Sequence, residues 1–336
     1  MSYDALVILS FGGPESPEDV MPFLRNVTRK RNVPDERLRV VADQYDQFGG
    51  KSPLNDHCRE LVAALQQEFA AHGIDLPVYW GNRNWKPYLT DVADEMAADG
   101  ISNALTFATS AFSSYSGCRQ YREDIDRATA DVDNLRMTKL RLFYNHPNFI
   151  ETFASNVETA FTQLAKGNEP RLVFTAHSIP LSMAATSEYE SQLLEASRLV
   201  AELLDVEPDH WDLAFQSRSG PPSMPWLEPD INDHLTSLAH DGTSDVVIAP
   251  LGFMSDHMEV LFDLDTQAKQ TAEKLGLGFA RASTVGNDAR IVSMIRELVQ
   301  ERSDGVRPRS LGTHGPWPNE CPENHCAIAS RAASTH

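Results

Sequence analysis

The sequence predicts an α/β protein made of two similar Rossmann-like lobes, each a doubly wound parallel sheet, with a cleft between them. Short apolar runs such as residues 5–9 and 246–249 are typical of buried parallel strands, because they do not alternate with polar residues. Stretches with helical spacing separate these runs, and strands that alternate with helices form parallel sheets with crossover helices. The same plan occurs twice along the chain.

The first predicted lobe covers residues 1–146. Its strands are expected at residues 5–9, 76–81, 103–110 and 140–144, with helices after residue 15, at 35–47, 55–72 and 88–99, and from about residue 118. Gly12 and Gly13 follow the first strand and allow close approach to a flat or anionic group. They lack the full dinucleotide fingerprint, so a nucleotide cofactor is only weakly supported.

The second predicted lobe covers residues 147–303. Its strands are expected at residues 171–176, 211–215, 246–249 and 278–281, with helices near 147–166, 188–204 and 228–240, after residue 255, and at 287–302. Residues 304–336 are rich in Gly, Pro, Ser and Asn and show no period, which predicts a tail.

Composition limits the function classes. The chain has 336 residues, 41% of them apolar, which is ample for a globular core. Its net charge of −19 argues against a general nucleic-acid binder and against an anionic membrane as a partner. No apolar run could span a membrane, and residues 5–10 are too short for a signal peptide. Four cysteines in so long a chain do not form a disulfide framework, which favours the cytoplasm.

Two polar residues stand where predicted strands of the second half end. His177 follows the strand at 171–176, and Glu259 lies in the first helical turn after the strand at 246–249, with Ser255 or Asp256 as the expected N-cap. Glu259 and Asp263 are four residues apart and share a helix face. An acidic residue in a first turn also simply favours the helix dipole. Two such groups at one sheet edge nevertheless predict a functional site.

The clearest basic cluster in this acidic chain is Arg29-Lys30-Arg31, after the first helix. It is either an anion site or a solvated complement to the helix dipole, and the sequence leaves both interpretations open.

Several separated motifs together resemble the ferrochelatase family, in its actinobacterial coproporphyrin III form, over residues 3–303. The motifs are residues 9–14 (LSFGGP), residues 175–180 (TAHSIP), residues 216–227 (QSRSG and PWL) and residues 252–265, which include His257-x-Glu259. The resemblance implies a chelatase-like pair of lobes with a porphyrin between them. It also implies that the protein inserts Fe²⁺, as substrate metal, into coproporphyrin III during haem synthesis.

The resemblance carries roles over to individual residues. It implies that His177 and Glu259 are catalytic and face each other across the porphyrin as metal ligands, with Asp263 as an outer metal-delivery site. Imidazole and carboxylate suit this chemistry independently, since imidazole accepts protons near neutral pH and both groups bind Fe²⁺.

The resemblance also implies porphyrin-binding residues. Arg29, Tyr45, Ser52 and Tyr121 match positions that hold propionates. Two positions depart from relatives: Phe11 replaces an iron-ligating Tyr, and Ala111 replaces a second His. Phe11 has no donor atom for iron, which leaves His177 as the main axial candidate.

Other functions remain open at this level. A protoporphyrin IX ferrochelatase, a cobalt chelatase and a non-catalytic porphyrin or haem carrier would use the same lobes and the same His177. A periplasmic-type binding protein fits the two lobes but not the cysteine usage. Small molecules are the expected partners, with transient contact to other haem-pathway enzymes.

The tail carries Cys321 and Cys326, which resemble the end of the cysteine pattern that holds a [2Fe-2S] cluster in actinobacterial ferrochelatases. Such a cluster takes four thiolates, and the tail supplies two. His314 and His325 could complete a cluster or a zinc site. We favour an empty tail, and place Cys58 and Cys118 on helices as small buried hydrophobes.

Overall fold

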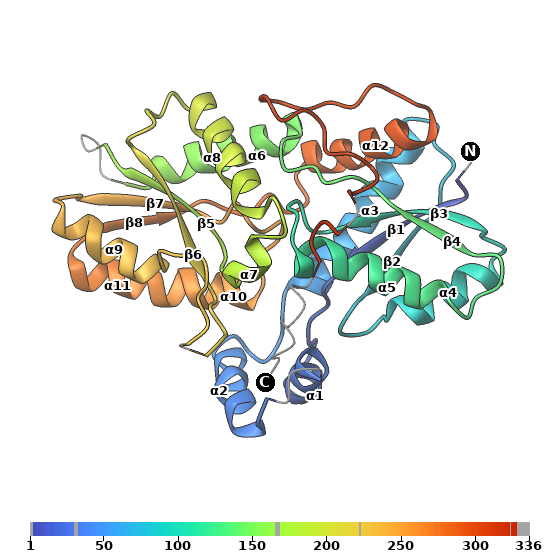
Figure 1. The fold of residues 1–336 in the computed structure, drawn as a ribbon, viewed down its shortest axis with the longest axis horizontal. Coiled ribbons are helices and arrows are strands. Elements are labelled where there is room, and N and C mark those ends of the chain that lie inside the picture. Colours follow the sequence, from blue (N-terminus) through green and yellow to red (C-terminus); the bar gives the residue numbers. More distant parts are fainter. Residues whose placement is uncertain (1–2, 30–32, 165–168, 222, 323, 328–336) are drawn as a thin grey trace, which may run out of the picture.

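The structure is a computed structural model that describes residues 3–29, 33–164, 169–221, 223–322 and 324–327. Two four-stranded parallel sheets lie side by side with helices packed around them (Figure 1). The first sheet has the order β2-β1-β3-β4 and the second the order β6-β5-β7-β8. The two orders are equivalent, which confirms the prediction of two lobes with the same plan.

The strands of the first sheet are β1 (Ala5–Ser10), β2 (Val78–Asn82), β3 (Asn103–Ala108) and β4 (Arg136–Lys139). Those of the second sheet are β5 (Arg171–His177), β6 (Trp211–Gln216), β7 (Asp245–Ala249) and β8 (Gly278–Arg281). All neighbouring pairs are parallel, as in the register Leu6 to Val78 or His177 to Gln216.

Helices of the first half are α1 (Pro17–Thr28), α2 (Asp35–Asp46), α3 (Leu54–Ala71), α4 (Leu89–Ala98), the π-helix η1 (Tyr115–Arg119) and α5 (Gln120–Thr129). Those of the second half are α6 (Pro147–Phe161), α7 (Leu181–Ala184), α8 (Tyr189–Leu203), α9 (Ile231–His240), α10 (Met258–Val260), the π-helix η2 (Leu261–Ala268), α11 (Lys269–Leu275) and α12 (Ala289–Ser303). None of these described helices combines the length and apolar composition needed to cross a membrane.

The strand β1 is buried throughout because both faces of its sheet are covered. Leu6 and Ile8 point into the largest core, whereas Val7 and Leu9 point into a second core under α4 and α5. Successive side chains of a strand face opposite ways, so one apolar run serves both cores.

The largest core belongs to both lobes. It contains Leu6 and Phe107 from the first sheet, Phe174 from the second, and Phe149 of α6. The last helix of the second half, α12, packs on α6 and also on α3 of the first half. The lobes are therefore joined by a continuous apolar interior.

One predicted strand is wrong. Residues 140–144 are not a strand, and β4 ends at Lys139, where its pairing with Thr106 of β3 also ends. The run Leu140 to Tyr144 is buried all the same, because it enters the shared core. Its apolar residues indicated burial, which we took as evidence for a strand.

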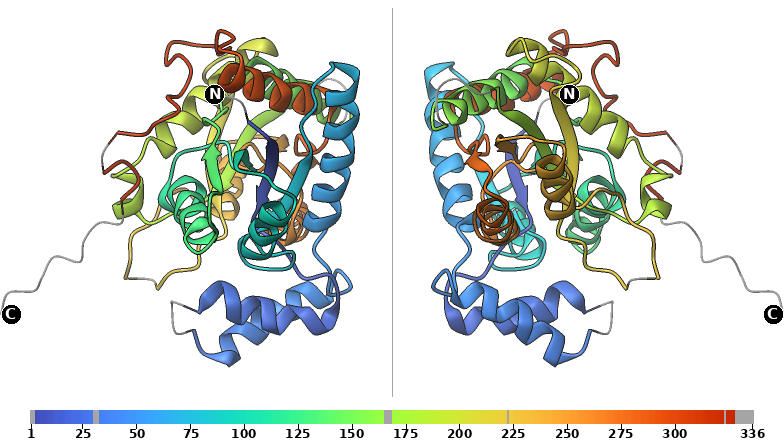
Figure 2. Two further views of the ribbon diagram at one scale, coloured as in Figure 1. Left: turned by 90° about the vertical axis from the view of Figure 1, so that its right-hand side faces the viewer. Right: turned by 90° about the vertical axis from the view of Figure 1, so that its left-hand side faces the viewer.

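The helices α1 and α2 form a hairpin that stands apart from both sheets (Figure 2). Its apolar faces meet around Phe23 and Tyr45, and Met258 of the second lobe joins the same cluster. The hairpin therefore touches the segment that carries Glu259.

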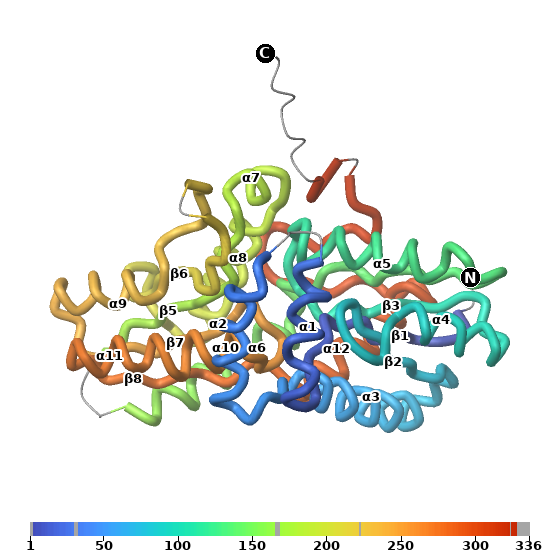
Figure 3. Tube along the Cα trace, turned by 90° about the horizontal axis from the view of Figure 1, so that it is seen from below, coloured from blue at the N-terminus to red at the C-terminus, as the bar shows by residue number. Residues whose placement is uncertain are grey.

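The tail has no helix or strand in its described part, as its composition predicts. It runs past α5 and α7, on a side of the molecule away from α3 (Figure 3). The backbone of Leu311 pairs with Asn145, and Cys326 donates its N–H to Thr186. The tail is thus fixed to the body of the protein through residue 327.

Candidate functional site

His177 is the last residue of β5, at the carboxyl edge of the second sheet. Its Nδ1 lies 2.5 Å from the Ser178 carbonyl oxygen, and its Nε2 lies 3.8 Å from Glu259 Oε2. A carbonyl oxygen only accepts, so Nδ1 carries a proton, and in the neutral ring Nε2 has the lone pair that faces Glu259. The Tyr189 hydroxyl donates to the His177 carbonyl at 3.0 Å. The structure thus brings His177 and Glu259 together, side by side at one edge of the second sheet.

The neighbouring strand β6 supports this pair. Gln216, beside His177 in the parallel register, donates its side-chain amide to the Glu259 carbonyl at 3.0 Å. The next residue, Ser217, donates its hydroxyl to the Asp263 carboxylate. Sequence reasoning named Gln216 only as part of a motif, without a role, and missed Tyr189. Gln216 could have been found, because it directly follows an apolar strand.

The expected N-cap of the helix at Glu259 is wrong. His257 caps α10, its Nδ1 accepting the Glu259 N–H at 3.2 Å. Asp256 instead lies 3.2 Å from Arg281 and accepts from the Thr284 hydroxyl. The Arg281 cation competes better for the Asp256 carboxylate than a backbone N–H does.

The helix that carries Asp263 is wound as a π-helix from Leu261 to Ala268, whereas the sequence predicted an α-helix. A π turn takes an i to i+5 hydrogen bond and occurs often at functional sites. Glu259 is exposed, Asp263 is partly buried, and Gln267 is exposed. The three residues therefore differ in their access to solvent although they are equally spaced.

Asp263 has the most informative electrostatics of the site. Burial raises the pKa of its carboxyl to about 6, the Ser217 hydrogen bond opposes this, and the negative charge of Glu259 adds to it. Burial likewise lowers the pKa of His257, while Glu259 opposes that shift. Asp263 can thus gain or lose a proton close to neutral pH.

Tyr45 reaches the site from the α1–α2 hairpin. It is buried, and its ring packs edge-on against Phe23 with centroids 6.3 Å apart. Burial, and then the charge of Glu259, raise the pKa of its hydroxyl. Tyr45 shares an apolar cluster with Met258, the residue before Glu259, so the hairpin and the second lobe meet beside this segment.

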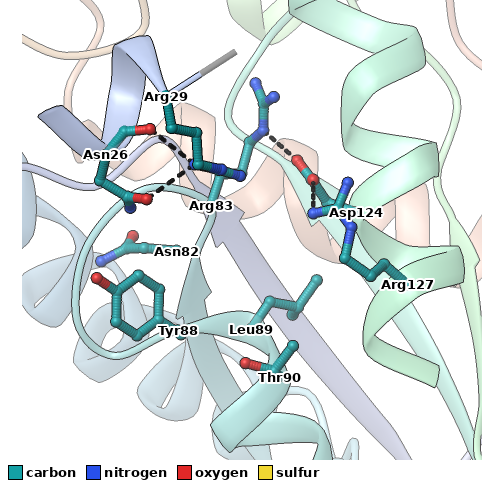
Figure 4. A pocket seen from close by; sticks show the side chains of 9 residues that line it. All are labelled: Asn26, Arg29, Asn82, Arg83, Tyr88, Leu89, Thr90, Asp124 and Arg127. Atoms are coloured by element: carbon teal, nitrogen blue, oxygen red, sulfur yellow. Dashed lines mark hydrogen bonds and ion pairs between the residues drawn. The ribbon is translucent and has the colours of Figure 1, made fainter. Parts of the chain in front are cut away.

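Arg29 lines a pocket of about 150 Å³ at the carboxyl edge of the first sheet (Figure 4). It is exposed, and its guanidinium donates to Asn26, which does not offset its charge. Arg83 and Arg127 line the same pocket and share Asp124, with Arg127 Nη1 at 2.7 Å from it. Three arginines against one aspartate make the pocket electropositive. Lys30 and Arg31 lie outside the described residues.

Ser52 and Tyr121 are both buried in this structure. The Ser52 hydroxyl accepts the Leu54 N–H at 3.4 Å, and the Arg83 guanidinium lies over the Tyr121 ring, 4.5 Å from its centroid. Arg83 thus joins Tyr121 to the electropositive pocket, a connection that sequence reasoning missed.

Phe11 and Ala111 are the two positions at which the sequence departs from its relatives. Phe11, directly after β1, is exposed and packs edge-on against Phe23 with centroids 6.3 Å apart. Ala111 is buried in the shared core.

The tail cysteines meet the first lobe. The Cys118 thiol, in η1 directly before α5, is hydrogen-bonded to Cys321. The charge of Cys118 also raises the pKa of Cys326, after the larger effect of burial. His314 hydrogen-bonds to Tyr144 at 3.1 Å. Within the described ranges, no group of three or more His, Cys, Asp or Glu side chains is arranged to hold a metal ion.

Comparison with known proteins decides the family. The family model for ferrochelatase matches residues 3–303. The chain belongs to the ferrochelatase family. It is 49% identical to a ferrochelatase of Rhodopirellula baltica over 98% of this chain and 95% of that protein. It is 50% identical to a coproporphyrin III ferrochelatase of Frankia alni, over 99% of this chain and 88% of that protein. A coproporphyrin III ferrochelatase of Nocardia farcinica is 51% identical over 93% of this chain and 92% of that protein.

Solved structures agree with the family at the level of the fold. SirB from Bacillus subtilis, determined with Fe³⁺, superposes with a TM-score of 0.53 at 12% identity, over 91% of this chain and 98% of that one. The sirohydrochlorin chelatase SirB from Bacillus subtilis subspecies spizizenii, in complex with cobalt, gives a TM-score of 0.52 at 11% identity, over 91% and 97% of the two chains. The chelatase-like fold of this ferrochelatase is therefore confirmed.

Proposed function

We propose that this ferrochelatase inserts Fe²⁺ into coproporphyrin III, with His177 and Glu259 as its catalytic pair. The single observation that carries the proposal is the approach of His177 Nε2 to Glu259 Oε2 at 3.8 Å, at the carboxyl edge of the second sheet. Relatives named coproporphyrin III ferrochelatases, similar over nearly the whole chain, support the substrate.

The chemistry follows from the state of the ring. Insertion removes two pyrrole protons, and the lone pair of His177 Nε2 can accept one while Glu259 offers a carboxylate beside it. Both groups can also contact the entering Fe²⁺. His177 and Glu259 alone are too few ligands for a resident metal site. They suit a substrate ion, because in the product the four porphyrin nitrogens bind the iron.

Asp263 is proposed as an outer delivery residue on the same helix. Its carboxyl has a pKa raised to about 6, so the ionised form that attracts Fe²⁺ is in balance with the neutral form near neutral pH. Ser217 orients this carboxylate by a hydrogen bond.

The test of the catalytic pair measures metal insertion with Fe²⁺ and coproporphyrin III. His177→Ala should abolish turnover, and Glu259→Gln should reduce it on the order of a hundredfold, as expected for a lost acid/base group. His210→Ala is the matched control, since His210 precedes β6 at the opposite edge of the same sheet. Near-normal turnover in folded His177→Ala would reject the assignment. Tight binding of porphyrin without turnover by the unaltered protein would indicate a carrier instead.

The electropositive pocket supports a substrate with four propionates. We propose that Arg29 and the pocket beside it hold a propionate, because guanidinium groups bind carboxylates through charge-assisted hydrogen bonds. Tyr45, Ser52 and Tyr121 are proposed as the hydroxyl partners. Ser52 and Tyr121 would have to turn their hydroxyls from the partners they have in this structure.

The KM values for coproporphyrin III and protoporphyrin IX test the proposed role of Arg29 in propionate binding. Arg29→Ala should raise KM for coproporphyrin III by about tenfold, the effect of losing one charge-assisted contact of 1.5 kcal/mol or so. KM for protoporphyrin IX should change less. Arg39→Ala is the control, an exposed arginine of the same hairpin. Equal losses on the two porphyrins, or a preference of the unaltered protein for protoporphyrin IX, would contradict the proposed substrate.

A [2Fe-2S] cluster is not part of the proposal, because the residues present do not fit it. Such a cluster takes four thiolates. The tail region brings together Cys118, Cys321 and Cys326, whereas Cys58 contacts Ser10 and Trp80 within the first lobe.

The cellular setting is also proposed. All four cysteines are free thiols, which is typical of proteins in the reducing cytoplasm. We propose transient contact with other haem-pathway enzymes, since a tetrapyrrole product must be handed on; co-purification from cross-linked cells tests it.

A further inference from the structure

The tail lies across both lobes beside the start of α5. Arg122 donates to the Asn319 carbonyl at 3.3 Å, and Arg119 donates to the His325 carbonyl at 3.3 Å. On the other side, the Cys326 N–H donates to the Thr186 carbonyl at 2.7 Å. These contacts come from different lobes, so they hold Asn319, His325 and Cys326 in place.

In that place two thiols from distant parts of the chain touch. Cys118 is 2% exposed, and its side chain is hydrogen-bonded to Cys321, which is partly exposed. Lys139 and Arg122 lie close to Cys118 as positive charges. The hydrogen bond from Cys321, followed by these two cations, lowers the pKa of the Cys118 thiol, while the same contact raises the pKa of Cys321. The two cations therefore favour a thiolate within this pair.

This arrangement differs from that of a metal site and from that of an inert core cysteine. Cys58, which is equally buried, shows the inert case: burial raises the pKa of its thiol to about 11. The pair instead combines two nearby cations, a second thiol in contact and, at Cys321, partial access to solvent, which are features of redox-sensitive cysteines.

We propose that Cys118 and Cys321 form a reversible disulfide when the protein is exposed to hydrogen peroxide. This disulfide would link the tail covalently to the first lobe. One thiolate of the pair attacks an oxygen of hydrogen peroxide, the O–O bond breaks, and that sulfur becomes a sulfenic acid while one water leaves. The sulfur of the other cysteine then attacks the sulfenic sulfur, and a second water leaves. Two thiols lose two electrons and two protons, and hydrogen peroxide is reduced to two waters.

The disulfide would act on the edge of the proposed porphyrin site. Cys118 lies in η1, directly before the helix that carries Tyr121, and the tail end of the link is tied to Thr186 after α7. Oxidation would therefore clamp α5 relative to the second lobe. The disulfide itself rests on the contact of the two thiols and does not depend on the proposed function.

The experiment uses the full chain, purified without oxygen and treated with hydrogen peroxide. After blocking of remaining thiols, non-reducing digestion and mass spectrometry should recover the peptide pair joined through Cys118 and Cys321, and dithiothreitol should release it. Cys118→Ser and Cys321→Ser should each lose this species. Cys58→Ser and Cys326→Ser should keep it, and circular dichroism should confirm that all four variants are folded.

Two results would overturn the proposal. One is a peroxide-treated protein whose main disulfide joins Cys321 to Cys326, or in which no disulfide forms. The other is stoichiometric iron and acid-labile sulfide in the anaerobically purified protein that disappear in Cys321→Ser, because the thiols would then hold a cluster.

Discussion

At the scale of single residues, the site depends on hydrogen bonds to backbone atoms. The Ser178 carbonyl fixes which nitrogen of His177 is protonated, and the Tyr189 hydroxyl holds the carbonyl of His177 itself. Gln216 does the same for the carbonyl of Glu259. Each residue of the proposed catalytic pair therefore has a supporting residue that holds its backbone and takes no part in the proposed reaction.

Asp263 gives a prediction about stability and pH. Its pKa is raised from 3.8 to about 6, which corresponds to about 3 kcal/mol against the ionised form in the folded protein. Below pH 3.8 the carboxyl is neutral in both states, so this cost is absent; it grows as the pH rises and is complete above about pH 6. Asp263→Asn should therefore be more stable than the parent at about pH 8, by up to roughly 3 kcal/mol.

Urea unfolding at about pH 5 and about pH 8 measures the effect. The advantage of Asp263→Asn should be clearly smaller at the lower pH. An advantage that is the same at both pH values would contradict the raised pKa of Asp263.

At the scale of elements, the turn after β7 positions the site. A Cβ on Gly252 would lie 2.6 Å from the Ala176 Cβ and 2.7 Å from its Cα. The Gly252 N–H also donates to the Thr175 carbonyl at 3.0 Å. The turn that leads to Glu259 is therefore pressed against the strand end that presents His177, and only glycine allows this approach.

Gly252→Ala should separate the turn from β5. We expect a loss of about 1–3 kcal/mol from overpacking, together with a clear fall in kcat for metal insertion. Gly276→Ala is the matched control, because Gly276 caps α11 with a φ of 75° and has open space around it. It should cost about 1 kcal/mol through its backbone alone and keep the kcat of the parent. Equal kcat values for the two folded variants would show that the close approach is not needed.

The elements also show what the sequence could predict. Apolar runs predicted the strands that end at His177 and before Glu259, since buried parallel strands have few polar residues. The same reasoning failed at residues 140–144, where burial comes from the shared core. The His257 cap was missed because Asp256 is held by Arg281, which lies elsewhere in the chain. Nothing in the sequence indicated the π winding at Asp263.

At the scale of the whole molecule, a buried ion pair joins the two lobes. Arg141 follows β4 of the first lobe, and its guanidinium holds Glu301 of α12 through two hydrogen bonds of 2.6 and 2.8 Å. Their side chains are only 2% and 6% exposed. Arg141 also donates to the Arg309 carbonyl at 2.9 Å, so the tail is part of the same junction.

Removing one partner of this pair should be costly. Glu301→Ala leaves a buried guanidinium without its counter-charge, so we expect a loss of about 3–5 kcal/mol. Asp35→Ala, which removes the exposed pair with Arg25, should cost less than about 1 kcal/mol. Chemical unfolding should show one transition for both variants, because the lobes share a core. Two separated transitions in the parent protein would contradict a shared core.

The contacts that join the two lobes could not be predicted from the sequence. The repeat of strands and helices predicted two lobes, but nothing in residues 289–303 indicated that α12 would lie on α3 as well as on α6. The same holds for the tail, whose composition predicted the lack of regular structure but not the contact between Cys321 and Cys118.

The position of α12 has a consequence for how the protein is made. About 220 residues separate the end of α3 from the start of α12, and a ribosome adds roughly 5–20 residues per second. The apolar face of α3 is therefore synthesised tens of seconds before the helix that covers it. During that interval the nascent first lobe shows part of its interior to solvent and to other chains. The first lobe can complete its packing only near the end of translation, so a chain that stops before α12 would lack a closed interior in either half.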